Sequence, residues 1–148
     1  MTFVLDASVI VKWLLQDPQR EPDSDAATGL VEAVVTGAES VLQPPHWLVE
    51  VGAVLARASP DSAAKDLLML SALEFPTADD PRALRRACEM AIDLKQHLFD
   101  TLYHAVALEA PGTMLITADE RYFRAARSAG GILRLKDWPA PSTAPSLP

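Results

Sequence analysis

Residues 2–15 read TFVLDASVIVKWLL, and this stretch decides the fold class. Its first part, TFVLD, is a short apolar run typical of a strand. The following segment, 7–15, places Val9, Ile10 and Trp13 at helical spacing. The stretch therefore predicts a strand, a sharp turn and a helix, with Asp6 where the strand ends.

Strand and helix signals continue to alternate along the rest of the chain. Further strands are expected at 40–43, 113–117 and 132–135, and a short one at 73–77. Helices are expected at 26–35, 46–58, 59–73, 80–93, 94–108 and 119–129. Strands that alternate with helices imply right-handed crossovers and a central parallel sheet with helices on both faces. The fold class expected is α/β.

The length of 148 residues, about half of them apolar, suits one domain with one core. We expect that domain to span 1–138. The last ten residues, 139–148, read PAPSTAPSLP and have the composition of a disordered tail.

The apolar stretches predict no membrane segment, because charged residues interrupt them well before the roughly 18 residues that a membrane span needs. No basic segment precedes an apolar N-terminal run, so no export signal is expected either. Cys88 is the single cysteine, which excludes an intramolecular disulfide and a multi-cysteine metal site. The chain is expected to be cytoplasmic, with Cys88 as a small core residue.

The net charge of −7 disfavours nucleic-acid binding through a broad basic surface. The charge is uneven, however: residues 1–74 hold 4 Lys and Arg against 11 Asp and Glu, whereas residues 75–148 hold 9 of each. The late cluster is Arg121, Arg124, Arg127, Arg134 and Lys136. It is either a phosphate-binding face or the solvated side of a helix.

Two acids follow expected strands. Asp6 and Asp119 both lie at the carboxyl edge of the expected parallel sheet, where α/β proteins place their ligands. Each also has a purely structural alternative. An Asp before a helix is a preferred N-cap, and Thr117 and Glu120 are spaced as a capping box around Asp119.

Two further acids interrupt nearly apolar helical segments. Glu50 lies in WLVEVGAVLA, and Asp100 lies in LFDTLYHAVALEA. A helix that is apolar nearly all round is buried, and a buried carboxylate costs several kcal/mol unless it is paired or binds a metal. The alternative for Glu50 is a narrow solvent stripe shared with His46 and Arg57.

The four acids can converge on one sheet edge only if something neutralises them, because like charges a few ångströms apart cannot all stay ionised. A divalent cation is the simplest neutraliser. Carboxylates without cysteine or clustered histidine favour Mg²⁺ or Mn²⁺ over Zn²⁺. His104 is expected to be a partly buried histidine with a hydrogen-bond partner rather than a catalytic one.

Four segments together resemble the PIN-domain nucleases, and in particular the VapC-type toxins of prokaryotic toxin–antitoxin pairs. The segments are VLDASVIVKWLL at 4–15, PHWLVEVGAVL at 45–55, FDTLYHAVA at 99–107 and LITADERYF at 115–123. The resemblance runs from residue 3 to about 138 and implies a PIN-like three-layer α/β/α sandwich. It also implies that Asp6, Glu50, Asp100 and Asp119 hold one or two Mg²⁺ or Mn²⁺ ions, oriented by Ser8 and Thr117.

The activity implied by the resemblance is metal-dependent hydrolysis of RNA by an endoribonuclease acting as a toxin. The implied partners are an RNA substrate, a cognate antitoxin and a second copy of the chain in a homodimer. Two alternatives stay open: a PIN nuclease of RNA maturation without an antitoxin, and a non-catalytic PIN-like binding module.

Overall fold

The structure is a computed structural model that describes residues 1–15 and 23–138. The tail expected at 139–148 lies outside the described residues, and so does most of the loop expected at 16–25.

The described residues form a four-stranded parallel sheet in the order β2-β1-β3-β4. Its strands are β1 (Thr2–Leu5), β2 (Ser40–Val41), β3 (Thr113–Thr117) and β4 (Ile132–Arg134). In the register of the two central strands, Leu5 pairs with Ile116. The expected parallel sheet is confirmed, and its central pair ends at the two places where Asp6 and Asp119 follow.

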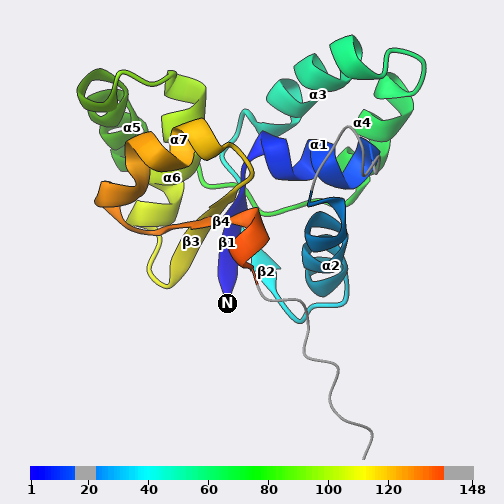
Figure 1. Cartoon of the computed structure of the whole chain (residues 1–148), viewed down its shortest axis with the longest axis horizontal. Helices are drawn as coiled ribbons and strands as arrows, with labels where there is room; N and C mark the ends of the chain where they lie inside the picture. Colours follow the sequence, from blue (N-terminus) through cyan, green and yellow to red (C-terminus); the bar gives the residue numbers. More distant parts are fainter. Residues whose placement is uncertain (16–22, 139–148) are drawn as a thin grey trace, which may run out of the picture.

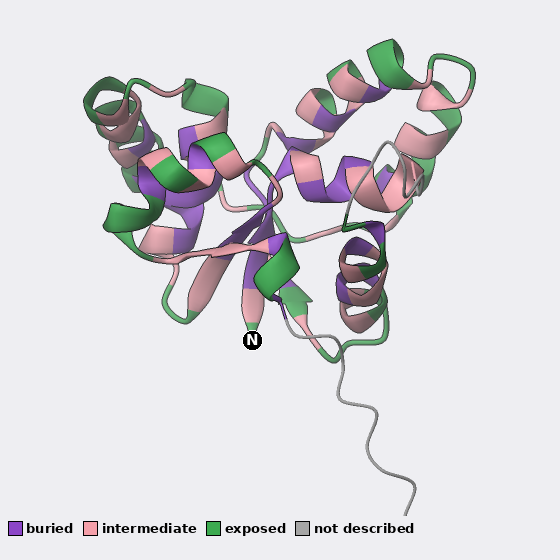
Figure 2. Cartoon of the chain, viewed as in Figure 1, coloured by how far each residue is buried: buried purple, intermediate pink, exposed green. Residues whose placement is uncertain are grey.

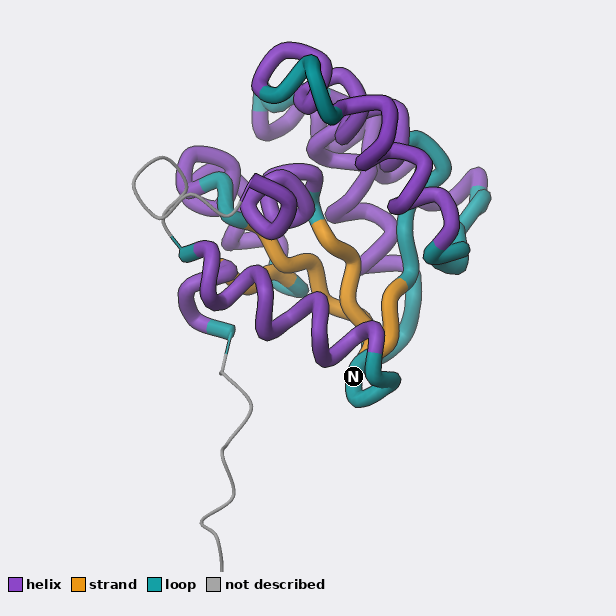
Figure 3. The backbone as a smooth tube through the Cα atoms, turned by 90° about the vertical axis from the view of Figure 1, so that its right-hand side faces the viewer, coloured by secondary structure: helices purple, strands orange, loops and turns teal. Residues whose placement is uncertain are grey.

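Helices cover both faces of this sheet. They are α1 (Ala7–Leu15), α2 (Ser24–Val35), α3 (Trp47–Ala58), α4 (Ala63–Ala72), α5 (Pro81–Leu94), α6 (Leu98–Glu109) and α7 (Glu120–Ala126). Figure 1 shows α1 and α2 on one side of the strands and α5, α6 and α7 on the other. Helices α3 and α4 pair with each other, and α3 packs on α1 (Figures 1 and 3). The α/β class with three layers is confirmed.

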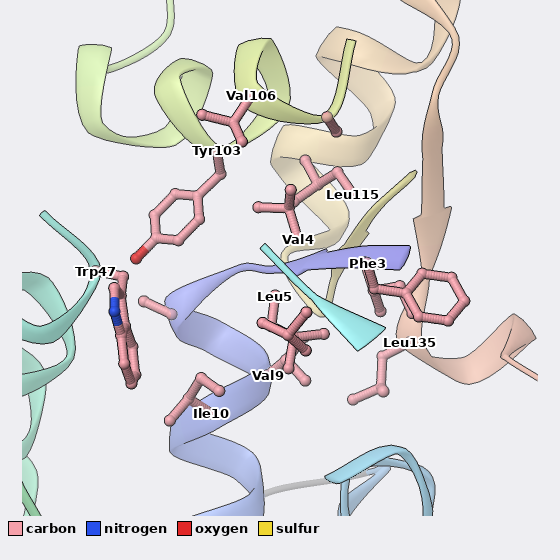
Figure 4. Packing of buried hydrophobic residues seen from close by; sticks show 14 of the residues in the cluster. Phe3, Val4, Leu5, Val9, Ile10, Trp47, Tyr103, Val106, Leu115 and Leu135 are labelled. Carbon is pink, nitrogen blue, oxygen red and sulfur yellow. The ribbon is translucent and has the colours of Figure 1, made fainter. Parts of the chain in front are cut away.

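The core is built on β1, whose residues point alternately to the two faces of the sheet. In Figure 4, Val4 lies on the side of Val106 in α6, and Leu5 lies on the side of Val9 in α1. All four side chains are fully buried or nearly so. Burying one such aliphatic side chain contributes roughly 1.5–3 kcal/mol, so the sheet, α1 and α6 form the rigid base for the residues beyond the strand ends. Figure 2 shows this buried centre under exposed outer helix faces.

Gln43 extends the sheet after β2 has ended. Its side-chain Oε1 accepts a hydrogen bond from the Leu5 amide (2.8 Å), and its Nε2 donates to the Leu5 carbonyl oxygen (2.9 Å). The side chain is fully buried. A side-chain amide thus takes the place of a neighbouring strand at the last residue of β1.

Some expected boundaries are wrong. The helix expected at 94–108 begins at Leu98, because Lys95 ends α5 in the left-handed conformation (φ 52°) and His97 then caps α6. The strand expected at 73–77 is reduced to a single bridge between Gln43 and Thr77. The helix expected at 119–129 ends at Ala126 and continues as a 3₁₀ turn, Arg127–Ala129.

Cys88 is exposed, which contradicts the prediction that it is a core residue. Helix α5 buries Ala83 and Ala87 against the domain, and Cys88 follows one residue after this buried row. No helix within the described residues is long and apolar enough to cross a membrane.

Candidate active site

Asp6 is the buried anchor of the site. It follows β1 directly, and its amide donates to the Ile116 carbonyl oxygen at 3.0 Å, which extends the pairing of β1 with β3. Its carboxylate Oδ2 accepts hydrogen bonds from the hydroxyls of Ser8 (2.6 Å) and Thr117 (2.8 Å). Burial raises the pKa of Asp6, and the two hydroxyl donors act against that rise.

Ser8 and Thr117 also fix the segment that carries Asp119. The Ser8 hydroxyl oxygen accepts from the Ala118 amide (3.0 Å), and the Thr117 hydroxyl oxygen accepts from the Asp119 amide (3.0 Å). Each hydroxyl therefore donates to Asp6 and accepts from the backbone after β3. The two residues therefore hold the Asp6 carboxylate in place relative to the segment that follows β3.

Asp119 is the N-cap of α7. Its Oδ1 accepts from the Tyr122 amide at 2.9 Å, so the helix start given as the structural alternative is present, but without a capping box between Thr117 and Glu120. The Thr117 hydroxyl is committed to Asp6, and Asp119 takes the cap instead. The capping bond involves Oδ1, and the residue also lines the cleft described below.

Glu50 lies in the first turn of α3 rather than in the middle of a buried helix. That helix is buried on one side only: Trp47 and Val51 are in the core, whereas Val49 is 76% exposed. The reason is geometric, because α3 packs against α1 and α4 and leaves its remaining side uncovered. The sequence inference that the whole helix is buried is therefore wrong.

The surroundings of Glu50 leave one carboxylate oxygen without a hydrogen bond. His46 Nε2 lies 3.1 Å from the Phe99 carbonyl oxygen and 3.2 Å from Glu50 Oε2. The carbonyl oxygen can only accept, so it receives the imidazole hydrogen. Glu50 Oε2 is buried and has no hydrogen-bond partner among the described residues.

Asp100 lies in the first turn of α6 and is half-buried. Burial, followed by the charges of Asp6, Glu50 and Asp119, raises the pKa of its carboxyl to about 6. This mutual repulsion is the electrostatic signature of acids gathered at one place.

All four acids line a single open cleft of about 390 Å³ at the carboxyl edge of the sheet. They reach it from the starts of four separate helices, α1, α3, α6 and α7. Helix N-termini carry partial positive charge, which favours nearby carboxylates. The convergence predicted from the sequence is present in the structure.

Lys12 also lines this cleft, and the sequence analysis missed it. Its spacing of four residues from Ser8 places both on one face of α1, which is the signal that could have identified it. In the late basic cluster, Lys136 pairs with Glu120 (2.6 Å) and Arg134 with Asp137 (2.6 Å). These contacts support the solvated alternative for these two residues.

The donor set fits a hard divalent cation in its chemistry. The cleft offers carboxylate oxygens, including the Oε2 of Glu50, which accepts no hydrogen bond among the described residues, and its lining holds no cysteine. In the part of the chain that the structure describes, no three Asp, Glu, His or Cys side chains are already close enough together to hold a metal ion. A cation would therefore have to draw side chains of the cleft closer together.

His104 has a structural position, as expected. It is fully buried, and its two ring nitrogens lie 3.1 Å from the Tyr122 hydroxyl and 2.7 Å from the Gly130 carbonyl oxygen. Burial lowers the pKa of His104. The residue joins α6 to α7 and to the turn before β4.

Comparison with known proteins now adds to this geometry. The family model described as the PIN domain matches residues 3–128. The chain belongs to the PIN-domain family. PIN domains are generally nucleases, so membership indicates a hydrolase acting on nucleic acid.

A solved structure supports the PIN fold. PAE2754 from Pyrobaculum aerophilum matches with a TM-score of 0.58 and 17% sequence identity, over 92% of this chain and 90% of that one. This likeness concerns the fold alone. No protein with a curated function matches this PIN domain significantly.

Proposed function

We propose that this PIN domain is a metal-dependent endoribonuclease that hydrolyses phosphodiester bonds in RNA. The observation that carries the proposal is the single cleft lined by Asp6, Glu50, Asp100 and Asp119 at the carboxyl edge of the sheet. Family membership alone would leave room for a non-catalytic module, but such a module has no need of four acids in one cleft.

The four carboxylates would hold Mg²⁺ or Mn²⁺, with Asp6 kept in place by Ser8 and Thr117. When bound, the cation lowers the pKa of water and offsets the negative charge that grows on the reacting phosphate. Lys12 lies in the same cleft and carries a positive charge suited to a phosphate oxygen. No serine, cysteine or histidine nucleophile is required.

The biological role proposed is that of a toxin held inactive by a cognate antitoxin, with the PIN domain forming a homodimer. The support is the resemblance to VapC-type toxins. The sequence offers five apolar residues that could line a groove for an antitoxin helix: Trp13, Leu14, Leu15, Trp47 and Leu48. Trp47 is instead buried against Phe75, and the other four are half-buried and packed on the core. An antitoxin Arg paired with Asp6 and Asp100 would occupy the acid cleft with a permanent cation.

The test of the activity is cleavage of single-stranded and structured RNA by the wild type and by Asp6→Asn. We expect cleavage that needs Mg²⁺ or Mn²⁺, stops with a chelator and is abolished by Asp6→Asn. Equal cleavage by both proteins, after contaminating nuclease is excluded, would refute the assignment.

The test of the toxin role is growth after expression of the PIN domain alone and together with a small gene adjacent to its own. We expect growth arrest alone, and rescue with complex formation on co-expression. Normal growth with no co-purifying partner would leave an RNA-processing nuclease as the better function.

A further inference from the structure

A second pocket, of about 400 Å³, opens beside the acid cleft. Glu50, Val54 and Asp100 line both spaces, so the two adjoin. The remaining lining residues come from α3, α6 and the segments just before them: His46, Val49, Ala53, Arg57, His97 and Phe99. Its lining is mainly apolar and aromatic, in contrast to the acidic cleft.

Phe99 is the exposed aromatic residue of this pocket. Its side chain belongs to the second residue of α6, next to Asp100, and the residue is 49% exposed. The His46 and His97 rings flank it, with centroids 5.4 and 5.0 Å from the Phe99 ring. About half of the Phe99 surface is nevertheless in solvent, and this part is open to a ligand.

The backbone of Phe99 is fixed although its ring is exposed. Its carbonyl oxygen accepts from His46 Nε2 (3.1 Å), and its amide donates to His97 Nδ1 (3.4 Å). Because the backbone is already fixed, stacking of a flat ligand on the ring costs only side-chain freedom.

Arg57, in the last turn of α3, is the cation of the pocket and is exposed. No ion pair joins it to any of the described residues. A guanidinium group binds phosphate oxygens or stacks on a planar ring. An aromatic platform with an arginine beside it is the combination that holds a nucleotide in single-stranded nucleic acids.

We propose that this pocket binds a nucleobase of single-stranded RNA, on the nucleotide next to the phosphate in the acid cleft. Phe99 stacks on the base, and Arg57 contacts the adjoining phosphate. Bases within a duplex are already stacked and do not reach such a pocket, so the substrate is unpaired at this nucleotide. The inference rests on the proposed nuclease function and adds a base-binding subsite to it.

The experiment compares the wild type with Phe99→Ala, Phe99→Trp and a control, Ile92→Ala, using cleavage of a single-stranded RNA oligonucleotide. Ile92 is an exposed apolar residue of α5 that does not line the pocket. A second substrate carries an abasic nucleotide beside the cleaved phosphate. We expect Phe99→Ala to raise KM about tenfold with kcat nearly unchanged, because stacking one base on an aromatic ring changes affinity by roughly 5- to 150-fold. Ile92→Ala should keep the wild-type KM, and Phe99→Trp, which retains an aromatic ring, should raise KM far less than Phe99→Ala.

The abasic substrate separates stacking from a general loss of structure. We expect it to raise KM for the wild type by a factor similar to that of Phe99→Ala and to leave the KM of Phe99→Ala unchanged. The inference is overturned if Phe99→Ala has the wild-type KM, or if Phe99→Ala raises KM by the same factor on the intact and the abasic RNA. In either case, cleavage that Asp6→Asn abolishes would still support the proposed function. A Phe99→Ala protein that is normal on RNA but loses a protein partner assigns the pocket to that partner and overturns the inference. Absence of any RNA cleavage by the wild type overturns both.

Discussion

At Asp6, opposing effects act on one carboxyl group. Burial and the charges of Glu50 and Asp119 favour its protonated form, whereas the Ser8 and Thr117 hydroxyls favour the ionised form. Sequence analysis placed this aspartate at the edge of the sheet because a strand signal and a helix signal meet there. It could not derive the two hydroxyl contacts, since the one to Thr117 joins residues 111 positions apart.

Asp100 makes the stability of the metal-free protein dependent on pH. The pKa of its carboxyl is raised from the ordinary value of 3.8 to about 6 in the folded state, so the folded state binds this proton more tightly than the unfolded state does. The free energy of unfolding should therefore fall as the pH rises from about 4 to about 6. Urea unfolding in EDTA at several pH values measures this fall, and Asp100→Asn should reduce it. An identical pH profile in the variant would contradict the electrostatic account.

Tyr103 offers a residue-scale test of burial. Its hydroxyl is buried near Glu50 and makes no hydrogen bond of good geometry with the described residues, and burial raises the pKa of this phenol. Removing a buried polar group that lacks a good hydrogen bond relieves its desolvation cost. Tyr103→Phe should therefore leave the unfolding free energy unchanged or raise it by about 1 kcal/mol, as measured by urea unfolding. A loss above about 1 kcal/mol would show that the hydroxyl is paired with Glu50.

At the scale of elements, the starts of α3 and α6 decide the site. The apolar pattern predicted both helices, but it could not show that Glu50 and Asp100 belong to first turns. The start of α6 depends on the left-handed backbone of Lys95 and on the His97 cap, and neither residue is a strong stop or start signal in a sequence. The apolar pattern of α3 predicted a helix buried on all sides. Val49 is nevertheless exposed, because a single apolar side chain can face solvent without packing against another element.

Gln43 is the element-scale prediction. Gln43→Leu should leave the amide and the carbonyl oxygen of Leu5 buried without partners, at a cost of roughly 2–4 kcal/mol in unfolding free energy. The matched control is Gln96→Leu, since Gln96 makes one part-buried bond of 3.3 Å to the Leu94 carbonyl oxygen. Urea unfolding of both variants should show the larger loss for Gln43→Leu. Equal losses would mean that the side chain does not complete the sheet.

At the scale of the whole molecule, the net charge is negative, and four acids line the cleft in which the proposed RNA substrate, an anion, would bind. The acids of the cleft therefore need a local compensation before an anion can bind, and we propose that a divalent cation supplies it. The order of strand and helix signals predicted the parallel sheet, and a parallel sheet brings its strand ends to one edge. The adjoining pocket was not predictable, because it forms only where α3 and α6 meet.

Metal binding should stabilise the whole domain. A ligand that binds only the folded state adds RT ln(1 + [L]/Kd) to the unfolding free energy, about 2.7 kcal/mol at a concentration one hundred times Kd. We expect Mn²⁺ to raise the Tm of the wild type and to leave the Tm of Asp6→Asn nearly unchanged. Ca²⁺ and Zn²⁺ serve as comparison ions in the same thermal unfolding series. An equal rise of Tm with Mn²⁺ in both proteins would place the cation elsewhere.

The central claim is that the four carboxylates share a bound divalent cation, and anomalous diffraction from crystals soaked in Mn²⁺ tests it most directly. The account predicts one or two anomalous peaks in the cleft, about 2.1 Å from carboxylate oxygens of the four acids, and none there in Asp6→Asn. A wild-type protein that cleaves RNA in Mn²⁺ but shows no peak between Asp6, Glu50 and Asp100 would contradict it.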